Sequence, residues 1–458
     1  MPSLILIPFI SLFTPIYLLF LYIRRNRISG SFAFFHPYCD ACGGGERVLW
    51  LALNAMHERF PDLNFIIYTG DIDRTPQQIL EKVNSRFGIS VPTDRLQFIF
   101  LHSRWLLEAK NYPRFTLIAQ LFAGLIVGFE ALWRFCPEWF IDTTGCPLTL
   151  PLFYWLGGAK TLCYVHYPTI TTEMIHLVDS RTSTYNNSSI IASSFLLTKL
   201  KLIYYRIVAL LYKGCGCCSQ LTMANGSWTS SHIEQLWSTK PKIVFPPCNV
   251  ERLLELENNS EIKMEKVDEE NIFNVQIISV GQIRPEKNHL EVKLIIAGGC
   301  RNEEDTKRVE FLQNYAKGNF GMKSGVEIDW ELNINCERLL ELMKNSLIGL
   351  HTMWNEHFGI SVVEGMAAGV IMVANNSGGP ALDIIGNENL NNEKCGFLAS
   401  TKEEYINIIL QIITEMNVEE RKNIREAARR KALNFSDICF EDKFCNLIGS
   451  FFTETNET

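Results

Sequence analysis

Short apolar runs alternate with longer amphipathic stretches, and this alternation limits the possible folds of the chain more than any other feature. In the first half the runs are bounded by Gly, Pro or Asp, and helical patterns such as Glu46–Phe60 lie between them. The expected strands there are Phe32–Phe35, Phe65–Tyr68, Phe98–Leu101 and Thr161–Val165. Strands that alternate with helices are typical of a doubly wound, mainly parallel sheet of the α/β class.

A second set of the same kind follows in the other half. Its expected strands are Val275–Val280, Val292–Ala297, Leu347–Leu350 and Val370–Ala374, with helices such as Cys336–Asn345 and Ile360–Ala368. The sequence therefore predicts two Rossmann-like domains. Because ligands of open α/β sheets bind at the carboxyl ends of the strands, we expect the two domains to face a cleft that holds the substrate.

The boundary between the domains is expected after the apolar run Ile243–Phe245. Pro246 and Pro247 end that run, and the segment Glu251–Asn271 is crowded with Glu, Lys and Asp. Proline ends regular structure, and charged segments are typical of linkers. The predicted division is a membrane anchor (1–28), an N-terminal domain (29–250), a linker (251–271), a C-terminal domain (272–440) and a tail (441–458).

The first 28 residues contain a segment suited to a membrane. Leu4–Ile23 is nearly all apolar, and roughly 20 such residues suffice to cross a hydrocarbon core of about 30 Å. Arg24, Arg25 and Arg27 follow at once, which places the C-terminal side in the cytosol. A cleaved signal peptide is the alternative, but the start lacks basic residues and no small-residue cleavage site precedes the arginines.

Charge and cysteine content limit the partners. A net charge of −7 provides no broad basic surface for phosphates, so nucleic acid is not an expected partner. The 14 cysteines have no regular spacing, which indicates reduced thiols in a cytosolic enzyme. Cys39 with Cys42 could be half of a zinc site, and Asp71 with Asp73 a metal-binding pair, but a turn explains the aspartates better and no metal is expected.

Two stretches, Thr116–Trp133 and Leu202–Tyr212, are unusually apolar, and the second is flanked by Lys199, Arg206 and Lys213. Both are predicted to be helices. Either they cover the N-terminal sheet, or they lie in the membrane interface with the basic residues near lipid headgroups. The sequence leaves both interpretations open.

Two segments follow expected strands and suit an anionic ligand. Gly43, Gly44 and Gly45 open a helix, where backbone amides and the helix dipole favour negative charge; a plain strand-to-helix turn is the alternative. In the second half, Arg284 and Lys287 come directly after the strand Val275–Val280. A planar guanidinium and a mobile ammonium suit a diphosphate, whereas the alternative is a solvated basic turn.

Two carboxylates, Glu356 and Glu364, flank the start of the helix Ile360–Ala368. If all the intervening residues were helical the two would be about 12 Å apart, beyond the roughly 5 to 9.5 Å of glycoside hydrolases. Binding of donor-sugar hydroxyls by one and ribose hydroxyls by the other, with the diphosphate at the helix start, fits this spacing better. For Glu364 the alternative is a capping box with Ser361.

With Arg284 and Lys287, the Glu356-x7-Glu364 motif resembles the retaining GT-B glycosyltransferases of family 4. Within that family the sequence is most similar to the mannosyltransferases that extend dolichol-linked oligosaccharides at the endoplasmic reticulum. The runs that carry the similarity are His36–Tyr38, Gly43–Trp50, Cys163–Pro168, Lys201–Tyr205, Pro246–Cys248, Gly281–Lys287 and Gly298–Glu304.

This resemblance implies a GT-B fold and retaining transfer of α-1,2-linked mannose from GDP-mannose. The implied acceptor is Man(3)GlcNAc(2)-PP-dolichol, extended to Man(5)GlcNAc(2)-PP-dolichol for N-linked glycosylation. It also implies a single-pass protein of the endoplasmic reticulum membrane with its catalytic domains on the cytosolic face, no metal cofactor, and sibling mannosyltransferases of the early pathway as partners.

The resemblance also implies roles for individual residues. Arg284 and Lys287 would neutralise the GDP diphosphate, Glu364 would hold the ribose and Glu356 the mannose. His166 would lie near the reacting centre. Gly43, Gly44, Gly45, Phe358, Gly359 and Ile360 would complete the donor-binding segments.

One departure from the family lies in the C-terminal half. Only Gly281–Glu291 would join two expected strands, whereas a parallel crossover needs about a dozen residues and usually contains a helix. The family has a helix there. Two alternatives therefore stay open: another lipid-linked mannosyltransferase, and an inactive isoform or faulty gene model that lacks this helix.

Overall fold

The computed structural model describes residues 17–181, 193–255, 277–280, 295–300, 303–322, 324, 328–386 and 393–456. The chain forms two compact units. Unit 1 consists of Met1–Asn225, Thr229–Val244 and Glu441–Thr458, and unit 2 of Gly226–Trp228 and Phe245–Phe440. The chain therefore crosses from one unit to the other four times, whereas the sequence predicted a single linker.

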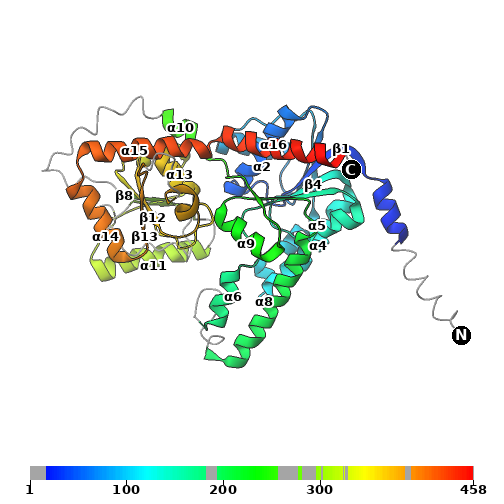
Figure 1. Ribbon diagram of the computed structural model, residues 1–458, viewed down its shortest axis with the longest axis horizontal. Coiled ribbons are helices and arrows are strands. Elements are labelled where there is room, and N and C mark those ends of the chain that lie inside the picture. Colours follow the sequence, from blue (N-terminus) through cyan, green and yellow to red (C-terminus); the bar gives the residue numbers. More distant parts are fainter. Residues whose placement is uncertain are drawn as a thin grey trace. The chain divides into compact units, whose positions relative to one another are not determined.

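Unit 1 is built on a seven-stranded sheet in the order β3-β2-β1-β4-β5-β6-β7, of which Figure 1 labels β1 and β4. All its pairings are parallel. The strands are β1 (Ile28–Phe35), β2 (Asn64–Thr69), β3 (Leu96–Phe100), β4 (Pro137–Asp142), β5 (Lys160–Val165), β6 (Leu221–Ala224) and β7 (Lys242–Ile243). The order reverses at β1, so the carboxyl ends of β1, β4 and β5 lie next to one another.

Helices connect these strands and cover both faces of the sheet, as expected for a parallel sheet. They are α2 (Gly44–Arg59), α3 (Pro76–Phe87), α4 (Thr116–Arg134), α5 (Thr149–Pro151), α6 (Thr172–Asp179), α8 (Phe195–Gly216), α9 (Ser227–Trp237) and α16 (Asp437–Asn456). Short 3₁₀ turns span His102–Leu107 and Ala109–Asn111, and a π-helical turn spans Leu152–Gly157.

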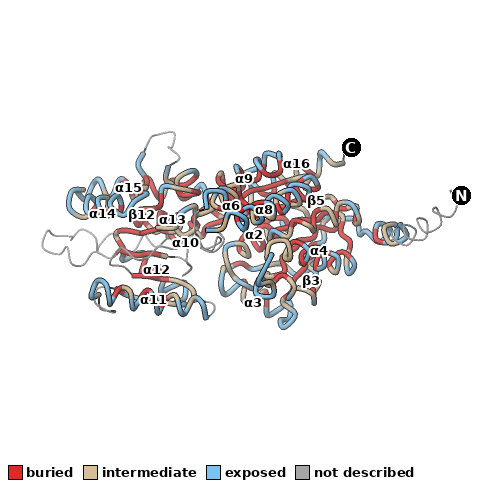
Figure 2. The backbone as a smooth tube through the Cα atoms, turned by 90° about the horizontal axis from the view of Figure 1, so that it is seen from below, coloured by how far each residue is buried: buried red, intermediate tan, exposed pale blue. Residues whose placement is uncertain are grey.

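Strand β1 shows why the sheet is buried on both sides. Phe32 and Phe35 are both fully buried, and Figure 2 shows the strands as the most buried part of the chain. The ring of Phe32 lies 6.3 Å from that of Phe452 in α16, whereas the ring of Phe35 lies 6.1 Å from that of Phe140. Each such side chain contributes about 1.5 to 3 kcal/mol through burial.

The observed division differs from the predicted one at two places. The units separate at Val244 and Phe245, because Val250 and Leu253 of helix α10 (Val250–Glu255) are already buried in the core of unit 2. Residues 441–456, predicted to be part of a tail, belong to α16, and Phe451 and Phe452 pack on Trp139 of unit 1. Most of the predicted linker lies outside the described residues.

Unit 2 contains a six-stranded parallel sheet in the order β10-β9-β8-β11-β12-β13. The strands are β8 (Ile277–Val280), β9 (Ile295–Gly298), β10 (Asp329–Leu332), β11 (Ile348–His351), β12 (Ile371–Asn375) and β13 (Phe397–Ala399). The helices are α11 (Glu303–Phe320), α12 (Cys336–Lys344), α13 (Ile360–Ala367), α14 (Lys402–Leu410) and α15 (Val418–Ala432), with π-helical turns at Pro380–Ile384 and Gln411–Glu415.

The predicted crossover Gly281–Glu291 lies outside the described residues. The described part of β8 ends at Val280 and that of β9 begins at Ile295. The two strands pair in parallel, as the sequence predicted. The length of the connection and the presence of a helix in it stay predictions.

Several helices begin at a polar capping residue, whereas α2 and α13 begin at a glycine. Thr75, Asn335, Thr401 and Asn417 cap their helices through side-chain oxygens. Helices α2 and α13 instead begin at Gly43 and Gly359, which have no side chain to do this. Because the first amides of a helix have no intrahelical acceptor, a glycine start leaves them open to other partners.

The two apolar stretches are helices, and each has both a buried and an exposed apolar face. α4 buries Leu121 and Val127 in the core and exposes Phe122 and Trp133. α8 likewise exposes a row of aliphatic side chains. Among the described residues, α4 is the one helix long and apolar enough to cross a membrane by length and composition. Most of the expected anchor Leu4–Ile23 lies outside the described residues, which begin with a helix at 17–25.

Candidate active site

Glu356 lies in the loop between β11 and α13, where a buried histidine holds it. The Oε2 atom of Glu356 is 3.0 Å from Nε2 of His351, and His351 is the last residue of β11, with 2% of its surface exposed. The backbone carbonyl of His351 accepts a hydrogen bond from the Tyr405 hydroxyl at 3.2 Å. The strand end thus fixes the orientation of the carboxylate.

Gly359 sets the start of helix α13. Its φ of 108° is in the region that favours glycine, and the amide of Val362 donates to its carbonyl at 2.9 Å. Because the helix starts at Ile360, Ser361 lies inside its first turn and is not the N-cap, so the capping box with Glu364 does not form. Glu364 is half-buried on the same helix, and its predicted contact with the ribose stays a prediction.

A second glycine segment packs closely against the backbone of the Glu356 loop. The amide of Gly379 donates to the carbonyl of Glu356 at 2.7 Å, and the Ser377 hydroxyl accepts from the Asn355 amide at 2.8 Å. A Cβ atom at Gly378 would overlap the Glu356 backbone, and one at Gly379 the Phe358 backbone. The close approach requires glycine at both positions, so this segment shapes the loop.

Phe358 contributes packing rather than a ligand contact. Its side chain is 2% exposed, and its ring lies 5.5 Å from that of Phe245 and 5.4 Å from that of Phe435. The expected role of its neighbours Gly359 and Ile360 rests on the amides at the start of α13.

The segment Gly226–Trp228 completes this region of unit 2. The buried carboxylate of Asp383 accepts from both the amide, at 2.8 Å, and the hydroxyl of Ser227. Burial raises the pKa of Asp383, and the hydrogen bonds from Ser227 act against that rise. The ring of Trp228 lies 5.0 Å from that of His357, so the segment also contacts the Glu356 loop.

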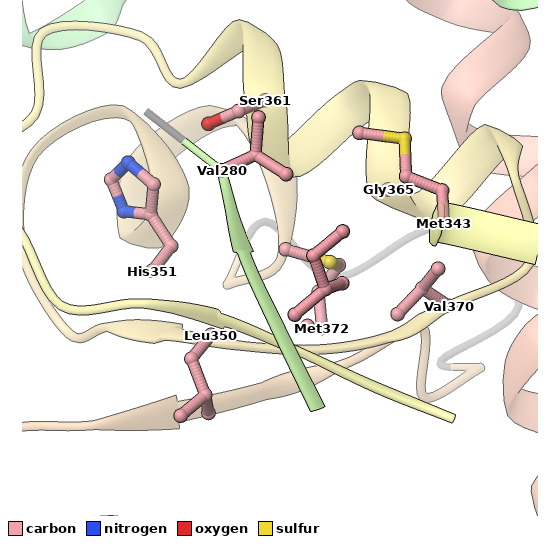
Figure 3. Close-up of a pocket in the computed structure, with 10 residues that line it drawn as sticks. Val280, Met343, Leu350, His351, Ser361, Gly365, Val370 and Met372 are labelled. Atoms are coloured by element: carbon pink, nitrogen blue, oxygen red, sulfur yellow. The ribbon is translucent and has the colours of Figure 1, made fainter. Parts of the chain in front are cut away.

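A small cavity of about 10 Å³ adjoins the start of α13. His351, Val280 and Ser361 lie at one end, and Met343, Gly365 and Val370 at the other (Figure 3). Its volume is close to that of one water molecule. Val280 is the last described residue before the segment that carries Arg284 and Lys287, and these two cations lie outside the described residues.

In unit 1 the glycine run forms the turn that the sequence predicted. β1 ends at Phe35, Gly43 is the N-cap of α2, and Gly44 and Gly45 are its first two residues. The position that a Cβ atom would occupy on Gly45 lies 3.5 Å from Nε2 of His166. The structure therefore brings two of the predicted site elements together.

His166 follows directly after β5 and is a neutral base. Burial lowers its pKa to about 4, and the nearby charge of His36 acts in the same direction. The nearby Thr143 backbone acts to raise this pKa, and the Nε2 atom of His166 is buried and has no hydrogen-bond partner within the described ranges. A neutral imidazole of this kind can accept a hydrogen bond from a ligand.

Among the described residues, no group of three or more His, Cys, Asp or Glu side chains could hold a metal ion. Asp71 instead closes a loop: it lies 2.9 Å from Arg104 and accepts from the Asp40 amide and the Thr69 hydroxyl. Cys39 is buried against the same Thr69 hydroxyl, 3.1 Å away. These side chains are therefore structural.

Two family models match the chain along most of its length. The model described as ALG11 mannosyltransferase N-terminus matches residues 29–237, and the model described as glycosyl transferases group 1 matches residues 265–431. A Caenorhabditis elegans protein named GDP-Man:Man(3)GlcNAc(2)-PP-Dol alpha-1,2-mannosyltransferase is 45% identical, over 92% of this chain and 91% of its own. The human protein of that name is 41% identical, over 92% and 87%. The chain belongs to the ALG11 mannosyltransferase family.

Solved structures agree on the fold of this ALG11 family member. A sucrose-phosphate synthase from Thermosynechococcus elongatus matches with a TM-score of 0.63 at 13% identity, over 93% of this chain and 99% of that one. Anabaena HepE in complex with UDP and glucose matches with a TM-score of 0.59 at 14% identity, over 92% and 99%. The predicted GT-B fold, with two Rossmann-like domains, is confirmed.

Several residues that shape the site of this ALG11 family member escaped the sequence analysis. They are His351, Ser377, Gly378, Gly379 and Asp383 in unit 2 and Glu46 and Thr143 in unit 1. The pair Gly378 and Gly379 before a proline was the available signal, since adjacent glycines after an apolar strand indicate close backbone approach. The two histidine contacts had none: His36 and Thr143 follow strands that only the fold brings together, and the contact of His351 with Glu356 depends on the path of the loop after β11.

Proposed function

We propose that the protein transfers α-1,2-linked mannose from GDP-mannose to a dolichyl-diphosphate-linked oligosaccharide. The proposed acceptor is Man(3)GlcNAc(2)-PP-dolichol, extended to Man(5)GlcNAc(2)-PP-dolichol. The observation that carries the proposal is the similarity to relatives of that name over about nine tenths of the chain. The arrangement of Glu356 at the open start of α13 supports it, because it offers a carboxylate for sugar hydroxyls beside amides for phosphate.

In the proposed mechanism the protein stabilises the leaving diphosphate. Arg284, Lys287 and the amides at Gly359 and Ile360 bind the charge that develops as the sugar departs, which is the largest catalytic contribution in reactions of this type. Glu356 binds mannose hydroxyls and Glu364 the ribose. The configuration is retained when the acceptor attacks from the face that the diphosphate leaves, and the leaving phosphate takes the acceptor's proton. No metal takes part.

Unit 1 contributes a base and a second set of amides. His166 lies near the reacting centre in this proposal, and its unprotonated Nε2 accepts a hydrogen bond from a substrate hydroxyl. Gly43, Gly44 and Gly45 supply amides at the start of α2. Electrostatic binding by preorganised amides costs no reorganisation during the reaction.

The protein is associated with the membrane that holds its lipid acceptor. We place it in the endoplasmic reticulum membrane, with Leu4–Ile23 as a single-pass anchor and both units on the cytosolic face. Arg24, Arg25 and Arg27 support this orientation. Sibling mannosyltransferases of the same pathway are proposed partners.

A transfer assay tests the proposal. Purified full-length protein is incubated with GDP-mannose and Man(3)GlcNAc(2)-PP-dolichol, and the products are separated by size after mild acid release. Two added mannoses that are sensitive to an α-1,2-mannosidase are expected. Transfer to a shorter lipid-linked oligosaccharide would indicate another mannosyltransferase of the pathway, and no transfer to any acceptor would indicate the inactive isoform.

A further inference from the structure

A chain of buried polar groups joins the glycine turn of unit 1 to His166. Its members are His36 after β1, Glu46 in the first turn of α2 and Thr143 after β4. His36 is 2% exposed and Thr143 1%, and the Glu46 side chain is 14% exposed. Since β1, β4 and β5 are adjacent in the sheet, three strand ends place these groups next to His166.

Both carboxylate oxygens of Glu46 have hydrogen-bond partners. Oε1 lies 3.3 Å from Nε2 of His36, and Oε2 accepts a hydrogen bond from the Gly43 amide. The Glu46 carboxylate, in the first turn of α2, therefore accepts from the amide that precedes the helix. Gly43 has no side chain that could cap the helix. The amides of Gly44 and Gly45 belong to the same first turn and have no intrahelical acceptor, so the helix start keeps donors for a ligand.

His36 is held at its other nitrogen by Thr143. The Thr143 hydroxyl donates to the Phe35 carbonyl at 3.2 Å and lies 2.8 Å from Nδ1 of His36. A hydroxyl has one proton, so while it donates to Phe35 it can accept a hydrogen bond from Nδ1–H. Nε2 then faces a carboxylate, and both contacts are satisfied when both ring nitrogens donate.

The pair removes a charge that would oppose an anionic ligand. Burial acts to raise the pKa of Glu46, but the hydrogen bonds from His36 and from the Gly43 amide outweigh it, so the pKa is lowered and the carboxylate is ionised. A lone carboxylate at the start of α2 would cancel the favourable field of the helix dipole. A protonated His36 would restore that field for the Gly44 and Gly45 amides.

The same chain of groups positions His166. The backbone of Thr143 lies beside the His166 ring and acts to raise its pKa, while its side chain contacts His36. The unpartnered Nε2 of His166 points toward Gly45. Open amides and one open acceptor therefore lie together, an arrangement that suits a ligand with both a phosphate and a hydroxyl.

We propose that His36 and Glu46 are positioning residues for mannosyl transfer: the pair neutralises the start of α2 and thereby lets the Gly44 and Gly45 amides bind a substrate diphosphate beside His166. The proposal rests on the proposed function and goes further, because it assigns the anion site of unit 1 and the residues that keep it open. Both the nucleotide donor and the lipid-linked acceptor contain a diphosphate.

A double-mutant cycle tests the proposal. His36→Asn leaves the Glu46 carboxylate without its partner, and we expect the KM for the diphosphate substrate to rise by about tenfold with a smaller change in kcat. Glu46→Gln removes the negative charge and is expected to have a smaller effect. The double variant His36→Asn/Glu46→Gln is expected to regain most of the loss, since no charge is then left to repel the ligand.

Separate titrations identify the substrate. The KM for GDP-mannose is measured at saturating acceptor, and the KM for the acceptor at saturating GDP-mannose; the one that rises in His36→Asn names the diphosphate bound in unit 1. Glu58→Gln, the same substitution at the exposed end of α2, is the control and is expected to behave as wild type. Thermal unfolding confirms that each variant folds.

A double variant no more active than His36→Asn, with all variants folded, would overturn the proposal, because a purely structural pair gives that result. Equilibrium binding of inorganic pyrophosphate to the full chain provides a readout independent of turnover. Weaker binding in His36→Asn and recovery in the double variant support the anion site even if wild-type protein transfers no mannose. Equal binding by all variants would reject it even if the protein is active.

Discussion

Nε2 of His351 lies 3.0 Å from Oε2 of Glu356 and joins the end of β11 to the loop before α13. His351 is buried and cannot move without disturbing the sheet. The contact with its ring therefore restrains the Glu356 carboxylate, although that residue lies on a loop. A site assembled in this way depends on His351 almost as much as on the residue that contacts the substrate.

Replacement of His351 by Ala should lower activity without loss of the fold. We expect kcat/KM for GDP-mannose to fall by about tenfold to a hundredfold, because a misplaced binding group has effects of this size. His351→Gln, which keeps a donor, should retain more activity. His102→Ala, at an exposed position of unit 1, is the control, and equal rates for His351→Ala and wild type would show that Glu356 needs no such support.

Two glycine substitutions in unit 2 should have opposite effects on stability. In Gly379→Ala the new Cβ atom would overlap the Phe358 backbone, and we expect a loss of more than about 1 kcal/mol in the free energy of unfolding. Gly318→Ala lies at an exposed position of α11 with open space around it, and should gain about 0.5 to 1 kcal/mol. Urea unfolding of both variants measures the difference; a neutral Gly379→Ala would contradict the close approach.

The sequence predicted the two parallel sheets because buried strands are nearly continuous apolar runs. The expected strands Phe32–Phe35, Phe65–Tyr68 and Thr161–Val165 lie within β1, β2 and β5. Strand β4 escaped, since its run is short and begins with Pro137 and Glu138, and β1 begins at Ile28 rather than at the predicted Phe32. Periodicity locates strands better than it locates their ends.

The candidate site was predictable only where its residues are adjacent in sequence. Gly43–Gly45 and the Glu356 loop each follow one strand, so a local motif sufficed. His351 with Glu356, and His36 with Thr143, depend on side-chain directions and strand order. Local propensity does not contain this information, which is supplied by tertiary packing.

The half-buried His166 should make the protein less stable in mild acid. Its pKa is lowered to about 4 in the folded protein, against about 6.5 in an unfolded chain. Between these values the unfolded chain binds more protons, so stability falls as the pH drops through this window, by about 2 kcal/mol from pH 7 to pH 5. Urea unfolding of wild type and His166→Gln at both pH values measures this; an equal loss in both would place the acid sensitivity elsewhere.

Replacement of Lys287 by Ala tests the proposed phosphate contact. We expect turnover to fall by orders of magnitude, because the loss of one preorganised stabiliser of transition-state charge costs about a hundredfold to a thousandfold. Arg284→Lys, which keeps the charge but not the planar fork, should have a smaller effect. Lys307→Ala, on the exposed side of α11, is the matched control, and an unchanged rate in Lys287→Ala would exclude the phosphate role.

Deletion of residues 1–28 should leave part of the protein bound to membranes, because unit 1 has a second apolar surface. Leu200, Ile203 and Ile207 are 55%, 54% and 47% exposed on one face of α8. Lys199, Arg206 and Lys213 lie on the same helix, which contains no acidic residue. This pattern is typical of interfacial helices that bind anionic lipid.

Flotation with vesicles that contain or lack anionic lipid measures the binding of the truncated protein. Ile203→Glu and Ile207→Glu, introduced together into the truncated protein, should release it, because each places a charge on the apolar face of α8. Leu410→Glu, at an exposed position of α14 in unit 2, is the control and should not release it. If the deletion alone gives a fully soluble protein, α4 and α8 cover the sheet and do not lie in the membrane interface.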